Sequence, residues 1–203
     1  MLVDADQNQT GAVMDQAVRR TRLLGLPGSL RKTSYSRAVL RGLEIELGAT
    51  ADFEIRDVRL PLYNEDEDGA ATPEIVRQFR QAIDQSDGIV IATPEYNHGI
   101  PGVLKNALDW ASRPIGRSVL IDKPVLVMSV SPASTGGVRA QAQVHETLLA
   151  IPAHIVTGPQ IVIGNVAEKI REVRWWTSRF YASRYRPSTD LPRPAMYVEP
   201  SRI

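Results

Sequence analysis

The sequence of 203 residues contains no cysteine. This absence excludes disulfide scaffolds, zinc sites built from cysteine and thiol-based catalysis. The three histidines, His98, His145 and His154, also lack the spacing of a metal site. A chain of this length is expected to form one domain around a single core.

The sequence also lacks an excess of either charge and long apolar runs. Its 24 basic and 23 acidic residues leave a net charge of +1, so no overall field attracts nucleic acid. No apolar run approaches the ~18 residues of a membrane-spanning helix. The N-terminal segment has early acids and no apolar stretch of a secretory signal. We therefore expect a cytoplasmic protein that binds neither nucleic acid nor membranes.

Short apolar runs alternate with longer amphipathic segments along most of the chain. The periodicity predicts strands at 21–27, 52–58, 87–94, 123–130 and, with a Gly-Pro break, 153–164, and helices at 35–47, 75–83, 100–112 and 138–151. Such an alternation is typical of a three-layer α/β fold, a mostly parallel sheet with helices on both faces. We expect residues 21–170 to form this domain, after a flexible lead-in at 1–20.

Three strand-to-helix loops are rich in glycine, proline, serine or threonine. They are the first loop (28–34, GSLRKTS), the second loop (93–102, TPEYNHGIPG) and the third loop (131–137, SPASTGG). In a parallel sheet all three must lie at the same edge, beyond the carboxyl ends of the strands, where ligands bind in such folds. Their convergence predicts a ligand site more strongly than any one loop does.

The first loop has the chemistry of an anion site. A helix N-terminus offers unpaired N–H groups and a partial positive charge. Hydroxyls at Ser29, Thr33, Ser34 and Ser36 and the guanidinium of Arg31 add donors suited to phosphate. Neither G-x-x-x-x-G-K-[ST] nor G-x-G-x-x-G occurs here, so a single terminal phosphate is favoured. The alternative is an ordinary helix cap with a polar turn.

The second loop can present backbone amides and an aromatic face to a flat heterocycle, through the run from Pro94 to Gly99. The alternative is a structured turn. No carboxylate at a recognisable spacing orients His98, so a hydrolytic triad is not supported. The small residues of the third loop allow a close approach of backbone to a ligand. The alternative is an ordinary strand-to-helix turn, which has the same composition.

Taken together, GSLRKTSYSRAVL, TPEYNHGIPGVLKNALDW and SPASTGGVRAQAQV resemble the NAD(P)H-dependent FMN reductase family of the flavodoxin-like fold. This family includes quinone, azo-dye and chromate reductases. The resemblance covers about residues 21 to 169 and is most specific in the middle motif. It implies a five-stranded parallel sheet in the order 2-1-3-4-5, FMN as cofactor and NADPH or NADH as donor. It also implies a small-molecule acceptor and a homodimer or homotetramer.

The resemblance also implies positions for the parts of FMN. The phosphate would lie at Ser29, Arg31, Ser34 and Ser36 of the first loop and the helix after it. The isoalloxazine ring would border the second loop and, on its other side, the third; the residues concerned are Pro94, Glu95, Tyr96, Asn97, His98, Ser131 and Gly136. No catalytic side chain is assigned, because the cofactor carries the chemistry. Arg113, Arg117 and Arg139 are candidates for the 2′-phosphate of NADPH.

The sequence departs from the family pattern in two places. Ser36 stands where the family usually has asparagine, so FMN is expected to bind more weakly by about 1 kcal/mol, one net hydrogen bond. Residues 171–203 form a basic, aromatic tail in place of the usual acidic loop and final amphipathic helix. This tail is interpreted as an atypical last helix or as frame-shifted relative to relatives. Stacking on nucleic acid is less favoured.

The predicted function is hydride transfer from NAD(P)H to FMN and onward reduction of a quinone, azo compound, chromate or free flavin. A non-catalytic electron carrier is the main alternative, although carriers tend to be strongly acidic and this chain has a net charge of +1. A binding or regulatory module without activity is the second alternative. A P-loop kinase is the least favoured, since the required lysine–hydroxyl pair is missing.

Overall fold

A computed structural model describes residues 19–170. A parallel sheet forms its centre, with the order β2-β1-β3-β4-β5 and a further strand, β6, that also pairs with β4. The strands are β1 (Thr21–Pro27), β2 (Ala51–Ile55), β3 (Gly88–Thr93), β4 (Pro124–Val130), β5 (His154–Ile155) and β6 (Ile161–Ile163). The predicted strand order is confirmed. The flexible lead-in expected at 1–20, apart from Arg19 and Arg20, and the atypical tail expected at 171–203 lie outside the described residues.

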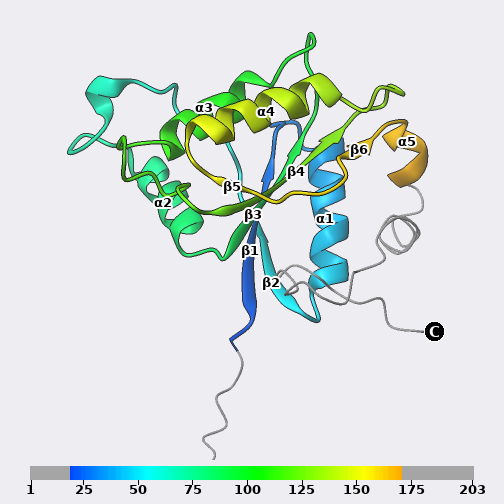
Figure 1. Cartoon of the computed structure of the whole chain (residues 1–203), viewed down its shortest axis with the longest axis horizontal. Helices are drawn as coiled ribbons and strands as arrows, with labels where there is room; N and C mark the ends of the chain where they lie inside the picture. The colour runs from blue at the N-terminus through cyan, green and yellow to red at the C-terminus, as the bar shows by residue number, and fades with distance from the viewer. Residues whose placement is uncertain (1–18, 171–203) are drawn as a thin grey trace, which may run out of the picture.

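Helices cover both faces of the sheet (Figure 1). The helices are α1 (Tyr35–Leu47), α2 (Glu74–Asp84), α3 (Gly102–Ala111), α4 (Val138–Ala150) and α5 (Val166–Lys169), with a 3-10 turn, η1 (Glu65–Glu67). One buried cluster joins β3 and β4 to α2, α3 and α4 through residues such as Ile89, Ile91 and Val127. The other joins them to α1 and α5 through Val90 and Met128. Alternate strand residues thus face opposite layers, as in a sheet buried on both sides.

The last strand, expected at 153–164 with a Gly-Pro break, is divided at that break into two short strands on the same edge of β4. Pro124 pairs with His154, thirty positions on, whereas Met128 pairs with Ile161, thirty-three positions on. Three extra residues therefore interrupt the ladder around Gly158 and Pro159. Proline has no N–H to donate, so a continuous strand is disfavoured there.

Strand β2 is also shorter than the strand predicted at 52–58, because it ends at Ile55. The carboxylate of Asp57 accepts a hydrogen bond from the backbone N–H of Arg59 at 2.8 Å, a local turn that competes with the ladder. The long connection then docks on α3, where Asn106 and the indole N–H of Trp110 donate to the carbonyl of Pro61 at 2.9 and 2.8 Å. No helix of the described part of the chain is long and apolar enough to cross a membrane.

Candidate functional site

The three loops meet at the carboxyl edge of the sheet, as the sequence predicts. The first loop begins beside the second, because the N–H of Gly28 donates to the carbonyl of Ala92, in β3 just before the second loop, at 2.8 Å. A Cβ at Gly28 would lie 3.0 Å from the Pro94 ring, so the close approach requires glycine. The second and third loops touch where a Cβ at Gly137 would lie 3.4 Å from Cβ of Glu95.

The first loop ends in a capped helix that leaves donors at its start. Ser34 is the N-cap of α1, and its hydroxyl accepts from the N–H of Arg37 at 3.2 Å. Among the described residues, nothing accepts from the N–H groups of Tyr35 and Ser36. The hydroxyl of Ser36 is buried and has no hydrogen-bond partner within residues 19–170. A buried polar group without a partner is uncommon and costly, so the start of α1 is suited to a ligand that accepts hydrogen bonds.

The remaining side chains of the first loop differ in their surroundings. Ser29 is buried, and its hydroxyl lies 3.0 Å from the phenol oxygen of Tyr96. Arg31 is exposed and lies over the ring of Tyr35, with 5.5 Å from its guanidinium carbon to the ring centroid. Arg31 forms no ion pair with any other described residue. Its charge is therefore available to an anion at the start of α1.

The second loop contains a tight two-residue turn. Tyr96 and Gly99 exchange backbone hydrogen bonds of 3.1 and 2.9 Å, and Asn97 and His98 between them have φ angles of 50° and 64°. Two positive φ angles in a row are characteristic of a type I′ turn, which reverses the chain sharply. The turn leaves the side chain of Tyr96 half exposed, at 51%.

The carboxylate of Glu95 faces α4. One carboxylate oxygen accepts from the N–H groups of Arg139 and Ala140 at 3.0 and 3.4 Å, so Glu95 caps this helix from another loop. Burial pushes the pKa of Glu95 upward, but the neighbouring His98 side chain and the N–H groups of Ala140 and Arg139 outweigh it and hold the pKa below its usual value. The sequence motif gave no indication of this capping role.

His98 has two charged neighbours, one of which, the carboxylate of Glu95, was not recognised from the spacing in the sequence. Its Nδ1 lies 2.7 Å from a guanidinium nitrogen of Arg139 and 3.3 Å from a carboxylate oxygen of Glu95. Arginine can only donate, so Nδ1 is the acceptor in the shorter contact, whereas a hydrogen bond to Glu95 would need a proton on the same nitrogen. The imidazole is 74% exposed. The arrangement fixes a surface turn and does not form a shielded catalytic dyad.

Two glutamines of α4 complete this attachment and were missed by sequence reasoning. The side-chain oxygen of Gln143 accepts from the N–H of Ile100 at 2.9 Å, at the end of the turn. Gln141 is fully buried and donates to the carbonyl of Val127 at 3.0 Å. Their polar character within an amphipathic helix was the only available signal, and exposed glutamines give the same signal.

The third loop is fastened to β6 and α5. Ser131 donates its N–H to Ile163, accepts at its carbonyl from Val166, and uses its hydroxyl to accept from Ala133. Gly136 has a φ of 68°, and a Cβ there would come within 2.2 Å of the Val162 side chain. In this structure both residues have contacts within the protein, and their expected position beside a flavin ring stays a prediction.

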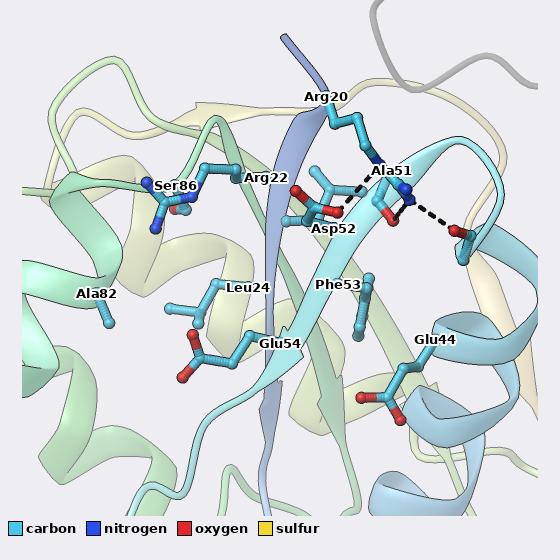
Figure 2. A pocket seen from close by; sticks show the side chains of 12 residues that line it. Arg20, Arg22, Leu24, Glu44, Ala51, Asp52, Phe53, Glu54, Ala82 and Ser86 are labelled. Carbon is cyan, nitrogen blue, oxygen red and sulfur yellow. Dashed lines mark hydrogen bonds and ion pairs between the residues drawn. The ribbon is translucent and has the colours of Figure 1, made fainter.

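The hollow drawn in Figure 2 lies at the opposite edge of the sheet, where β1 and β2 begin, and measures about 480 Å³. Two arginines line it: Arg20 donates to the carbonyls of Gly48 and Ala51 at 2.6 and 3.0 Å and pairs with Asp52 at 3.0 Å, whereas Arg22 has no ion pair among the described residues. A second hollow of about 670 Å³ lies along α3 and α4. Neither hollow is lined by residues of the three loops.

Comparisons with known proteins agree with this geometry. A model of the NADPH-dependent FMN reductase family matches residues 21–168. The chain belongs to this family. A quinone reductase of Pseudomonas putida is 42% identical over 141 residues, covering 69% of this chain and 76% of that protein. An NAD(P)H-dependent FMN reductase of Pseudomonas aeruginosa is 37% identical over 145 residues, covering 71% and 78%.

The fold of this FMN reductase also has solved relatives. FerB, a flavoenzyme NAD(P)H:(acceptor) oxidoreductase from Paracoccus denitrificans, superimposes with a TM-score of 0.63 at 28% identity. The match covers 80% of this chain and 96% of that one. Together with the strand order, this likeness confirms the flavodoxin-like fold.

Family membership makes FMN the cofactor and NAD(P)H the electron donor. The residues present fit the phosphate end of FMN. The start of α1 combines a buried hydroxyl without a partner, two unbonded N–H groups and the charge of Arg31, which are donors for a phosphate that accepts hydrogen bonds. At Ser36 the site fits FMN despite the departure from the family's usual asparagine.

Proposed function

We propose that this NAD(P)H-dependent FMN reductase passes its electrons to a quinone. The observation that supports the site is the buried, unpartnered hydroxyl of Ser36 at the start of α1. The same sheet edge carries the half-exposed ring of Tyr96, an aromatic surface suited to flat molecules. The 42% identical relative named a quinone reductase supports a quinone among the acceptors that the family reduces.

We assign the residues of this edge as follows. Ser34, Ser36 and Arg31, with the first N–H groups of α1, bind the phosphate, and Ser29 lines the same end. The turn at 94–98 borders the isoalloxazine ring through its backbone and the Tyr96 ring. The Glu95 carboxylate holds this turn in place by accepting a hydrogen bond from the start of α4. The backbone of the third loop, from Ser131 to Gly136, approaches the other side of the ring.

When bound, FMN accepts a hydride from NAD(P)H and supplies electrons to the acceptor. The protein positions these partners, and backbone N–H groups beside the ring stabilise negative charge that develops there. We assign no general acid or base, because the imidazole of His98 is exposed and its Nδ1 accepts from Arg139. Residues 21–170 are proposed as the FMN-binding reductase domain.

The assembly and location of the protein are further parts of this proposal. The resemblance to the family supports a homodimer or homotetramer, and a cytoplasmic location is proposed with it. Light scattering during size-exclusion chromatography of the full chain tests the assembly. A monomer at micromolar concentration would contradict it.

The test of function is the visible absorption spectrum of the full chain after mixing with FMN and desalting, followed by anaerobic NADPH. We expect a retained flavin band that bleaches with NADPH and returns when a quinone is added. A band that does not bleach would indicate a carrier or a binding module instead. Bleaching without recovery on quinone addition would contradict the proposed acceptor but not the FMN reductase.

A further inference from the structure

One side-chain hydrogen bond joins the two loops assigned to opposite ends of the flavin. The hydroxyl of Ser29, in the first loop, lies 3.0 Å from the phenol oxygen of Tyr96, in the second loop. Ser29 is only 4% exposed, whereas Tyr96 is 51% exposed. The bond therefore anchors a half-exposed aromatic ring to a buried group.

The phenol bond is the only hydrogen bond from the Tyr96 side chain to another described residue. The backbone of Tyr96 is fixed by its exchange of hydrogen bonds with Gly99. Rotation of the ring about its side-chain bonds is therefore restrained at the hydroxyl end by Ser29. Removing the Ser29 hydroxyl would free the ring without moving the turn.

The Ser29 hydroxyl has a limited number of bonds to offer. A serine has one O–H to donate and two lone pairs to accept with. The N–H of Arg31 already lies 3.4 Å from this oxygen and takes part of its accepting capacity. In the bond between Ser29 and Tyr96 either oxygen could be the donor, so the direction of the bond is not fixed by the protein alone.

A phosphate at the start of α1 would fix that direction. Phosphate oxygens accept strong hydrogen bonds and attract the proton of a nearby hydroxyl donor. Once the Ser29 proton points to phosphate, Ser29 can only accept from Tyr96, and the phenol must donate. Hydrogen bonds linked in a chain polarise and strengthen one another.

We infer that Ser29 couples the two halves of the flavin site: phosphate binding orders the Tyr96 ring through the Ser29 hydroxyl. Tyr96 is thus a positioning residue for the ring end of the site that senses occupancy of the phosphate end. The inference rests on the proposed position of the FMN phosphate. It predicts that the phenol hydroxyl of Tyr96 matters for a flavin that carries a phosphate and not for one that lacks it.

The test is a double-mutant cycle on the full chain, with Ser29→Ala, Tyr96→Phe and both together. Binding of FMN and of riboflavin is measured by quenching of flavin fluorescence. Tyr96→Phe is expected to weaken FMN binding about fivefold, the size of one net hydrogen bond. In the Ser29→Ala background the same change is expected to have less than about twofold effect. Riboflavin binding is expected to change less than about twofold with Tyr96→Phe in either background.

The matched control is Tyr63→Phe. It removes a phenol oxygen that also takes part in one side-chain hydrogen bond, from Arg113 at 3.1 Å, but outside the three loops. No change in FMN binding is expected. Thermal unfolding of every variant confirms that the fold is kept.

Two results would overturn the coupling. The first is independent losses, with Tyr96→Phe weakening FMN binding equally with and without the Ser29 hydroxyl. The second is an equal loss of riboflavin and FMN binding, which would give Tyr96 a merely structural role. Failure of the unaltered chain to bind FMN at all is a different result, because it contradicts the proposed function and removes the basis of the coupling with it.

Discussion

The two edges of the sheet treat their polar groups in opposite ways. At the edge where the strands begin, Arg20 is bonded to two carbonyls and to Asp52, although a hollow lies beside it (Figure 2). At the carboxyl edge, the Ser36 hydroxyl is buried without a partner, and Arg31 has no ion-pair partner among residues 19–170. Arg22 lines the same hollow and has no ion pair among residues 19–170, so the buried hydroxyl of Ser36 is the group that distinguishes the carboxyl edge.

This difference shows that a hollow and a binding site are separate properties. Concavity requires only that side chains leave space. A site for a charged ligand also requires groups whose hydrogen bonds are not satisfied within the protein. Four variants at the carboxyl edge test the contrast, from the largest expected effect to the smallest, and the first three are each paired with a matched change elsewhere.

Gly136→Ala is expected to have the largest effect. The new Cβ would meet Val162 at 2.2 Å while the residue keeps a φ of 68°. Strain and overpacking together are expected to lower the free energy of unfolding by about 3 kcal/mol, measured by urea denaturation. Gly116→Ala is the control, because Gly116 has a φ of 74° but no atom within 4 Å of the new Cβ; about 1 kcal/mol is expected there. Equal losses would mean that contact with β6 does not matter.

Arg31→Ala tests whether flavin binding depends on the carboxyl edge and not on the other edge of the sheet. Loss of one charged hydrogen-bond donor is expected to weaken FMN binding by roughly 10- to 100-fold and riboflavin binding hardly at all. Arg20→Ala, at the other edge, is expected to leave both unchanged. Isothermal titration of the two flavins measures the effects. The assignment of Arg31 to the phosphate would be contradicted by parallel losses for both flavins.

Glu95→Gln tests the cap of α4 and its pH dependence. Because the pKa of Glu95 is lowered in the folded protein from its ordinary 4.5, its stabilisation is fully present above pH 4.5 and is lost as the pH falls through the folded pKa. The variant is expected to be less stable by about 1 kcal/mol at neutral pH, and the difference should shrink below pH 4.5. Asp52→Asn, which alters a carboxylate that is 60% exposed, is expected to cost less. A constant difference across pH would rule out the carboxylate as its source.

Ser36→Ala is expected to give the smallest effect and opposite signs in two measurements. Removal of a buried hydroxyl without a partner is expected to leave the flavin-free protein as stable or slightly more stable, by less than about 1 kcal/mol. FMN binding is expected to weaken about fivefold, the size of one net hydrogen bond. Thermal unfolding with and without FMN measures both. A stability loss without FMN would show that the hydroxyl has a partner within the protein.

The arrangement of the sheet could be predicted from the sequence, because strand and helix periods and the direction of parallel strands are local or topological properties. The adjacency of the three loops could also be predicted, because the carboxyl ends of parallel strands lie at the same edge of the sheet. The break between β5 and β6 was less accessible. Gly158 and Pro159 were visible as a break. The pairing of both halves with β4 was not, because it requires the register of β6 to be shifted by three residues relative to that of β5.

The side-chain roles within the site were harder to predict than its position. Ser34 was expected at the start of α1, and the structure shows it as the N-cap. The contacts of Glu95 with α4 and of His98 with Arg139 join residues more than forty positions apart. No local pattern encodes such pairs, because they depend on how far α4 extends toward the second loop after the whole sheet has formed.

The interrupted strand at the edge of the sheet also affects the tendency of the protein to aggregate with other copies of itself. An uninterrupted edge strand offers a row of free N–H and C=O groups to another chain, which is how sheets join into aggregates. Here β5 and β6 have only two and three residues and are separated by Gly158 and Pro159. The interruption shortens the template that an incoming strand could copy. A replacement of 156–160 that made the edge continuous would therefore be expected to favour fibre formation.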